Sequence, residues 1–268
     1  MTERSKLTGW RKIAAATWGG PKDPQIFGDL EIDATGALVF MEEAREVSGV
    51  KLTMTHMVGK ALAHALGEHP DLNCHLYRGR LVRRESADVF FIVSAESGAE
   101  LSGVKVLHAD QKPVVEIAQE LARRVEAIRT GNDPEFGKTK KMFAAAPRRL
   151  LKLGFKLGSW LTTDLNLDLK RIGLPRDPFG SAMVSSVGMF GIQHAYAPLS
   201  PYYRIPFLVL VGEVAPKPTV VDNEIVARPM VTLSATLDHR YLDGFHAARL
   251  ARSVREYLED PKRFEPAN

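Results

Sequence analysis

A histidine and an aspartate stand four residues apart at the end of an apolar stretch near the C-terminus. They lie in the heptapeptide Asp238-His239-Arg240-Tyr241-Leu242-Asp243-Gly244. A histidine has an unperturbed pKa of about 6.5, so it can accept a proton near neutral pH, and its tautomer is set by the contact of its other ring nitrogen. The pattern therefore indicates a general base, although the spacing alone leaves a structural histidine open.

The residues on both sides of this motif predict a strand that gives way to a helix. Residues 230–237 are apolar and rich in β-branched side chains, as is typical of a largely buried strand. After Gly244, apolar residues recur at helical spacing until Pro261 ends the pattern. The histidine is thus expected at a rigid junction between two regular elements.

The motif resembles the active-site motif of the acyltransferase cores of 2-oxo-acid dehydrogenase complexes. Its His-x-x-x-Asp-Gly-Phe-His portion is also similar to chloramphenicol acetyltransferase, a member of the same superfamily of CoA-dependent acyltransferases. Four further stretches resemble the same relatives in the same order, at residues 9–12, 62–76, 106–128 and 184–191. The resemblance therefore spans residues 9 to 258.

The resemblance implies an α+β fold, with a chloramphenicol-acetyltransferase-like mixed β-sheet and flanking helices, assembled as a trimer with its active sites between subunits. The order of strands and helices, which has no strict βαβ repeat, independently favours α+β. We expect residues 1–268 to form a single acyltransferase catalytic domain without a lipoyl or peripheral-subunit-binding domain. Strands are expected at 26–32, 74–77, 81–84, 88–93, 104–107, 183–186, 207–214 and 224–237, and helices at 34–47, 55–67, 114–128 and after Gly244.

The resemblance also implies roles for individual residues. His239 would take the proton from the attacking group, and Ser185 would donate its hydroxyl to the oxyanion of the tetrahedral intermediate. Ser186, the adjacent serine in the same stretch, is the alternative donor. Asp243 would pair with Arg11 and so fix the loop that carries the histidine.

Coenzyme A or an acyl-CoA is the expected substrate, with no metal. The candidate residues for contact with its pantetheine arm are Gly188, Gly191 and Ser186, since glycine permits close approach of the backbone. No glycine-rich phosphate motif is present to locate the CoA phosphates. His246 is expected to be an ordinary residue of the first helical turn.

Residues 131–180 depart from the relatives and predict an insertion. Between residues 138 and 156 the chain carries seven basic side chains and no acidic one, and apolar residues continue to Leu161. One interpretation is a solvated basic face on an extra helix, another is a lid over the acyl or acceptor pocket, and a third is membrane contact through residues 138–161. The sequence favours them in that order.

Composition excludes several other classes. The 36 basic and 32 acidic residues give a net charge of +4, which is too small and too dispersed to indicate nucleic-acid binding. A single cysteine, Cys74, excludes an intramolecular disulfide, and without an activating partner it is expected to be structural. The N-terminus has no signal-peptide core, so a cytoplasmic protein is expected.

Three functions follow as hypotheses. The first is a free-standing CoA-dependent acyltransferase that acts on a thiol, hydroxyl or amine acceptor. The second is the acyltransferase core of a 2-oxo-acid dehydrogenase complex that uses dihydrolipoamide from another chain, and the third is a non-catalytic scaffold with the same fold. The first two predict a homotrimer or larger homo-oligomer, while the acyl group and the acceptor stay open.

Overall fold

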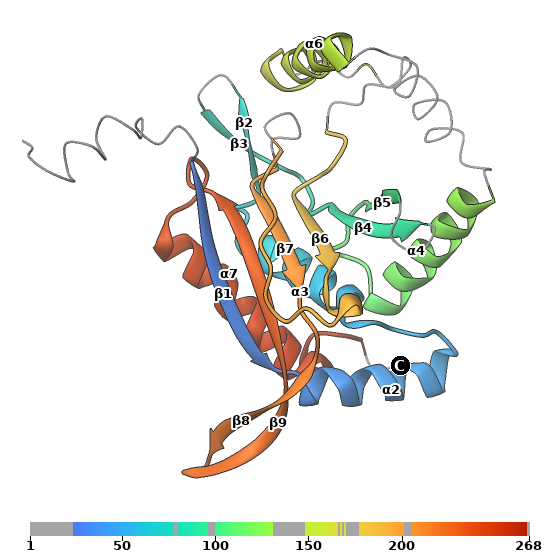
Figure 1. Ribbon diagram of the computed structural model, residues 1–268, viewed down its shortest axis with the longest axis vertical. Coiled ribbons are helices and arrows are strands. Elements are labelled where there is room, and N and C mark those ends of the chain that lie inside the picture. The colour runs from blue at the N-terminus through green and yellow to red at the C-terminus, as the bar shows by residue number, and fades with distance from the viewer. Residues whose placement is uncertain are drawn as a thin grey trace, which may run out of the picture.

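The computed structural model describes residues 24–77, 80–95, 100–130, 148–165, 167, 169, 177–200 and 205–266. Within them lie a seven-stranded mixed sheet, a separate two-stranded hairpin and helices packed against the sheet (Figure 1). The predicted α+β class with a mixed sheet and flanking helices is therefore confirmed.

The main sheet has the strand order β1-β9-β7-β6-β4-β5, and β8 pairs with the outer part of β9. The pairs β4–β6 and β6–β7 are parallel, and the others are antiparallel. The strands are β1 (Gln25–Asp33), β4 (Val89–Ala95), β5 (Glu100–Val106), β6 (Ala182–Ser186), β7 (Phe207–Val211), β8 (Ala215–Val221) and β9 (Glu224–Asp238), and the hairpin is β2 (Cys74–Tyr77) with β3 (Arg80–Arg83).

The helices end where local signals in the sequence end them. Gly49 closes its helix in the left-handed conformation at φ 69°, as its position in the sequence predicts. Thr53 and Asp243 cap the helices that follow them. The helices are α2 (Thr35–Ser48), α3 (Met54–Glu68), α4 (Val114–Arg129), α6 (Arg148–Ser159) and α7 (Gly244–Glu259), with short turns η2 (Trp160–Asp164), η4 (Gly188–Phe190) and η5 (Pro261–Arg263).

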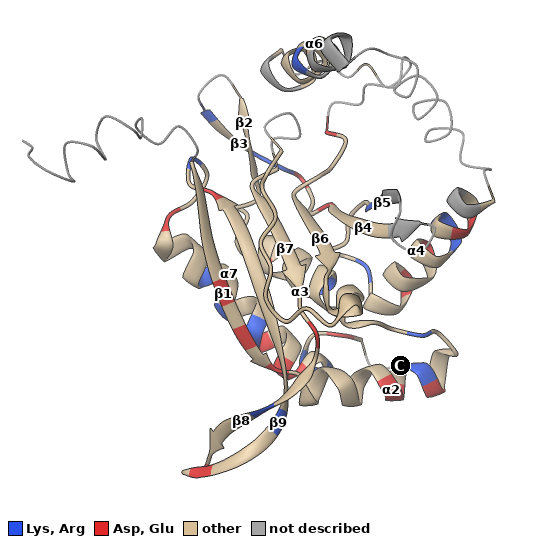
Figure 2. Ribbon diagram, in the orientation of Figure 1, with Lys and Arg blue, Asp and Glu red and all other residues tan. Residues whose placement is uncertain are grey.

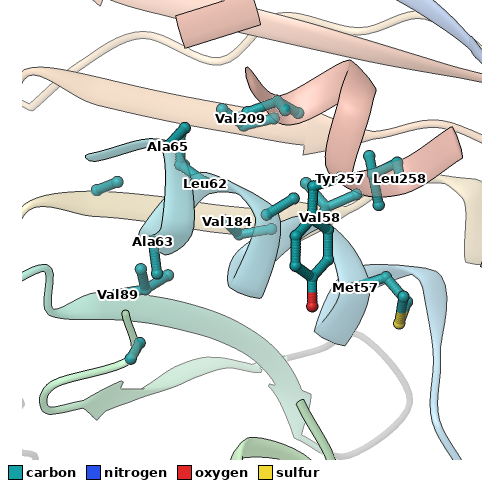
Figure 3. Packing of buried hydrophobic residues seen from close by; sticks show 14 of the residues in the cluster. Met57, Val58, Leu62, Ala63, Ala65, Val89, Val184, Val209, Tyr257 and Leu258 are labelled. Carbon is teal, nitrogen blue, oxygen red and sulfur yellow. The ribbon is translucent and has the colours of Figure 1, made fainter. Parts of the chain in front are cut away.

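The main core lies between the sheet and helices α3 and α7. Met57, Val58 and Leu62 of α3 pack with Val184 of β6 and with Tyr257 of α7 (Figure 3). Each such buried side chain contributes about 1.5–3 kcal/mol relative to an exposed one. The core thus holds α7, and with it the junction that carries His239, against the sheet.

Among the described residues, the opposite face of the sheet is covered by a mostly irregular segment that contains the short turn η4. Met183, Leu208 and Leu210 form a smaller apolar cluster there, against which the segment 187–199 packs. The Tyr196 hydroxyl donates to Asp29 Oδ2 at 2.5 Å, and the Leu199 N–H donates to Gln25 Oε1 at 2.7 Å, so this segment is fastened to β1. We refer to this side as the open face of the sheet.

The stretch from β7 to the turn at Asp222 differs from the prediction. The expected strand 207–214 ends at Val211, and a separate strand β8 follows from Ala215. Pro216 and Pro218 concealed β8 in the sequence, since proline is tolerated only on edge strands. Strands β8 and β9 form an arm that extends from the body, closed by Asp222 and Asn223 at φ 50° and 65° (Figure 1).

A partly buried histidine lies in the first turn of α3. The Thr53 N–H donates to His56 Nδ1 at 3.2 Å, and the His56 N–H donates to Thr53 Oγ1 at 3.4 Å. Because Nδ1 accepts, neutral His56 carries its proton on Nε2. Burial lowers the pKa of His56 from 6.5 to about 4.

Acidification should therefore destabilise the fold through His56. The unfolded chain binds a proton at this side chain near pH 6.5, whereas the folded chain does so only near pH 4, so stability is lost as pH falls between these values. We expect a loss of about 2 kcal/mol in the free energy of unfolding between pH 7 and pH 5. Urea unfolding of the native chain and of His56→Gln at both pH values measures this, and an equal pH dependence in the two chains would contradict it.

Candidate active site

His239 stands directly after β9, where the chain turns towards α7. Its backbone N–H donates to Pro24 O at 2.8 Å, and its side chain is exposed in the single chain. The neighbouring Asp238 is buried and accepts from the Arg240 guanidinium at 3.0, 3.1 and 2.6 Å. Charge-assisted bonds of this kind are among the stronger ones. The imidazole is thus presented to solvent from a backbone held on both sides.

The two residues after Arg240 anchor the loop in the core. Tyr241 and Leu242 are both buried, and the Leu76 N–H donates to the Tyr241 hydroxyl at 3.2 Å. Burial raises the pKa of Tyr241, so this phenol stays protonated at neutral pH. The loop between β9 and α7 is therefore tied to hairpin β2–β3 as well as to β1.

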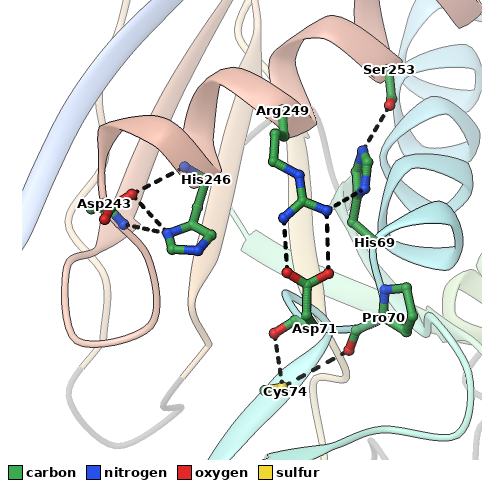
Figure 4. Close-up of polar contacts among 8 residues, drawn as sticks. All are labelled: His69, Pro70, Asp71, Cys74, Asp243, His246, Arg249 and Ser253. Atoms are coloured by element: carbon green, nitrogen blue, oxygen red, sulfur yellow. Dashed lines mark hydrogen bonds and ion pairs between the residues drawn. The ribbon is translucent and has the colours of Figure 1, made fainter.

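Asp243 is the N-cap of α7. Its Oδ1 accepts from the His246 N–H at 3.1 Å, and this backbone hydrogen bond is the main reason why the pKa of Asp243 is lowered. His246 Nδ1 lies 2.7 Å from Asp243 Oδ1 and 3.5 Å from the Asp243 N–H, and the shorter contact indicates that Nδ1 donates to the carboxylate (Figure 4). His246 is thus a first-turn helix residue, as predicted. The predicted partner of Asp243, Arg11, lies outside the described residues.

The two candidate serines point to opposite sides of the sheet. In β6, Ala182 and Val184 belong to the helix-covered core, whereas Met183 belongs to the cluster on the open face. Because side chains alternate along a strand, Ser185 shares the open face with Met183, and Ser186 shares the other face with Val184. The sequence alone does not show which face each serine takes. In the structure the two candidates therefore differ in their environment.

One chain does not bring its own His239 and Ser185 together. Ser185 lies opposite Leu210 of β7, which lies opposite Ser234 of β9, four residues before Asp238. Four residues of strand rise about 13 Å and two strand spacings add about 9 Å sideways, so the Cα atoms of Ser185 and Asp238 are roughly 16 Å apart. A base and an oxyanion donor must each approach the same reacting carbonyl to about 3 Å. A site that uses both residues needs a second copy of the chain.

Gly188 and Gly191 form the tight turn after β6. A Cβ at Gly188 would lie 2.5 Å from Gly212 O, and Gly191 adopts φ 73°. Both glycines therefore have a local structural requirement, which does not depend on a bound pantetheine arm.

A serine–histidine pair elsewhere looks catalytic and is structural. His69 Nε2 lies 3.1 Å from Ser253 Oγ, and the Arg249 Nη2 lies 3.0 Å from His69 Nδ1 (Figure 4). Since arginine only donates, Nδ1 must accept, and neutral His69 carries its proton on Nε2. That proton is donated to Ser253 Oγ, so His69 cannot act as its base.

This network instead ties α7 to the turn between α3 and β2. The Arg249 guanidinium donates to the two Asp71 oxygens at 2.9 and 3.4 Å, and this pairing lowers the pKa of Asp71. The nearby Cys74 is buried, its thiol donates to Asp71 O at 3.2 Å, and burial raises its pKa. Cys74 is thus held as a thiol, in agreement with the prediction that it is structural.

Removal of this tie should loosen the N-terminal half of α7. Arg249→Ala is expected to lower the free energy of unfolding by about 1 kcal/mol, a value that allows for the partial exposure of both partners. Arg252→Ala serves as the matched control, because Arg252 is an exposed arginine on the same helix. Urea unfolding of the two variants compares them, and equal losses would contradict the assigned role.

Two other kinds of feature are absent from the described residues. No group of three or more histidine, cysteine, aspartate or glutamate side chains there is placed to hold a metal ion. No described helix is both long enough and apolar enough to cross a membrane.

The arrangement of strands and helices matches solved acyltransferases. The chain superposes on a probable dihydrolipoamide acetyltransferase from Listeria monocytogenes with a TM-score of 0.67, at 21% identity over 99% of this chain and 98% of that one. The Azotobacter vinelandii dihydrolipoamide acetyltransferase gives 0.66 at 23% identity over 98% and 93%. Chloramphenicol acetyltransferase gives 0.53 at 13% identity over 88% and 89%. The fold is therefore the one these acetyltransferases share.

The family follows from the sequence match. The model for 2-oxoacid dehydrogenases acyltransferase (catalytic domain) matches residues 2–134 and 179–265, and the chain belongs to this family. This confirms the family predicted from the motifs. The dihydrolipoyllysine-residue acetyltransferases of the acetoin cleaving system and of the pyruvate dehydrogenase complex of Bacillus subtilis (strain 168) are 24% and 26% identical to it over 95% and 97% of this chain. The chain spans 55% and 50% of their lengths.

Proposed function

We propose that the chain transfers an acyl group between a CoA thioester and an acceptor thiol, hydroxyl or amine, with His239 as general base. The observation that carries the proposal is an exposed histidine, held through its backbone at the end of β9, in a member of an acyltransferase family. The Azotobacter vinelandii relative supports this role, because a serine, a histidine and an asparagine four residues later were investigated in its catalytic mechanism. Asp243 occupies the position of that asparagine here.

In the proposed reaction, His239 removes the proton from the acceptor as the acceptor attacks the thioester carbonyl. The Ser185 hydroxyl donates a hydrogen bond to the oxyanion, which is worth about 2.7–4 kcal/mol of barrier for such donors. Collapse of the intermediate breaks the carbon–sulfur bond, and His239 returns its proton to the departing CoA thiolate. Asp243 orders the loop, and in the proposal it also pairs with Arg11.

Dihydrolipoamide is the acceptor that the relatives favour. The relatives named above are dihydrolipoyllysine-residue acetyltransferases and this chain spans about half of their length, so a lipoyl group carried on another segment or chain fits the comparison. This moves the proposal from a free-standing enzyme with an unspecified acceptor towards the acyltransferase of a 2-oxo-acid dehydrogenase complex. A non-catalytic scaffold stays as the alternative that predicts no transfer.

We also propose a trimer or larger homo-oligomer with sites between its copies. The separation of His239 from Ser185 in one chain supports it. So does apolar surface left exposed on the arm, where Val220 and Ile225 are 68% and 79% exposed as a cross-strand pair. A neighbouring copy that covers this surface would bury both side chains.

In the same proposal residues 1–268 are one catalytic domain with an insertion at about 131–180. The family match leaves residues 135–178 unmatched, which supports that boundary. Of residues 131–180 the structure describes 148–165, 167, 169 and 177–180, and α6 begins directly after Pro147.

The experiment that tests the proposed function uses liquid chromatography to measure the free CoA formed from a panel of acyl-CoAs, from acetyl to long-chain, because transfer to a thiol acceptor leaves the number of free thiols unchanged. The native chain and His239→Ala are compared, each with and without dihydrolipoamide. CoA formation that depends on His239 establishes the acyltransferase, and acceleration by dihydrolipoamide favours the dehydrogenase-complex acceptor. If both chains form CoA at the same background rate and no CoA species raises their melting temperature, the non-catalytic scaffold would be the better account.

A further inference from the structure

Helix α6 presents apolar side chains to solvent beside basic ones. Residues 148–159 include four basic residues and no acidic one. Leu153, Leu157 and Trp160 follow at intervals of four and three, so they form one stripe along the helix, and they are 61%, 51% and 48% exposed. Lys156, also exposed, lies beside this stripe.

A second exposed element lies near this helix. Strand β3 consists of Arg80, Leu81, Val82 and Arg83, and all four are exposed. Because side chains alternate along a strand, each side of the hairpin presents one arginine and one apolar residue of β3. Turn η2, which continues α6, lies against β2, the partner of β3. Figure 2 shows basic positions on both α6 and this hairpin. We name the eight residues Arg80, Leu81, Val82, Arg83, Leu153, Lys156, Leu157 and Trp160 the basic–apolar surface.

The composition of this surface decides among the three interpretations of the insertion. A purely solvated basic face would not expose a leucine–tryptophan stripe, because exposed apolar clusters are unfavourable in water and mark contact sites. A lid over a pocket of its own chain would turn that stripe inward, whereas here it faces outward. Lysine and arginine beside leucine and tryptophan are the combination by which amphipathic elements bind in the headgroup region of anionic bilayers.

We propose that the basic–apolar surface binds the surface of an anionic phospholipid bilayer. Leu153, Leu157 and Trp160 would enter the boundary between headgroups and acyl chains, and the arginines with Lys156 would meet lipid phosphates. The contact is peripheral, since α6 is far shorter than a membrane-spanning helix. This inference is independent of the proposed acyl transfer.

Vesicle co-sedimentation of the full chain tests it. Phosphatidylcholine vesicles are compared with vesicles that also contain phosphatidylglycerol, at low and high salt. We expect binding to the anionic vesicles that falls with salt, and a loss of at least about tenfold in the partition coefficient for Leu153→Glu/Leu157→Glu. Lys156→Gln should weaken binding by about fivefold, as one interfacial charge does.

Val47→Glu is the matched control, because Val47 is an exposed apolar residue on α2, outside the basic–apolar surface. It should bind like the native chain. Light scattering checks that all variants keep the native mass, so that loss of binding cannot reflect loss of assembly. Absence of binding to either vesicle, equal binding to both, or native binding by Leu153→Glu/Leu157→Glu would each overturn the proposal.

Discussion

Replacement of His239 by alanine is expected to slow acyl transfer by about 10²–10⁴-fold while leaving the assembly intact. The imidazole is exposed, and the backbone bond from its N–H to Pro24 does not depend on the side chain, so the variant loses the base without losing a packing contact. Free CoA formed from the best acyl-CoA at saturating acceptor, followed by liquid chromatography, measures the change.

An exposed histidine outside the motif provides the control. His108→Asn removes an imidazole at φ 51°, a conformation that asparagine tolerates, and should leave the rate unchanged. Light scattering verifies that both variants keep the native mass. Native turnover by His239→Ala would exclude the proposed mechanism.

A mixture of two inactive variants is expected to regain activity. His239→Ala and Ser185→Ala chains each lack one part of the site, and Ser185→Ala alone should cost about 10²–10³-fold. If the two groups come from different copies, random co-assembly restores both to about a quarter of the sites. The variants are unfolded together, refolded and assayed, and the mass of the mixed assembly is measured by light scattering.

The doubly substituted chain His239→Ala/Ser185→Ala, refolded with an equal amount of native chain, is the reference. It separates true complementation from dilution, because a native chain assembled with it loses its partner group at shared sites. A mixture of the two single variants that stays inactive would place both groups in one chain, against the roughly 16 Å separation derived from the strand register.

The sequence predicted the elements that hold the histidine because two strong local signals coincide there. The β-branched run before Asp238 is typical of a strand, and the apolar residues after Gly244 recur at helical spacing. Asp243 caps the helix between them. The prediction missed strand β8 of the arm for a local reason as well. Two prolines in β8 hide the strand in the sequence, because proline is tolerated only in an edge strand.

The rest of the site depends on contacts that no local pattern encodes. Arg249 and Asp71 are 178 residues apart, and their pairing follows only once α7 packs beside α3. In the sequence, a basic residue on the helix after the motif is only a weak signal for this ion pair. The sides taken by Ser185 and Ser186 likewise follow from the phase of β6 against the core, which a five-residue strand does not reveal by itself.

The arm also bears on how the protein behaves at high concentration. Its two-residue turn makes Val221 and Glu224 a hydrogen-bonded pair, so the backbone groups of Val220, Pro218 and Pro216 point away from β9. Two of these three positions have no N–H to offer. A stray strand that approaches the outer edge of β8 therefore finds few donors, and the protruding arm resists the cross-β stacking by which exposed sheet edges seed fibrils.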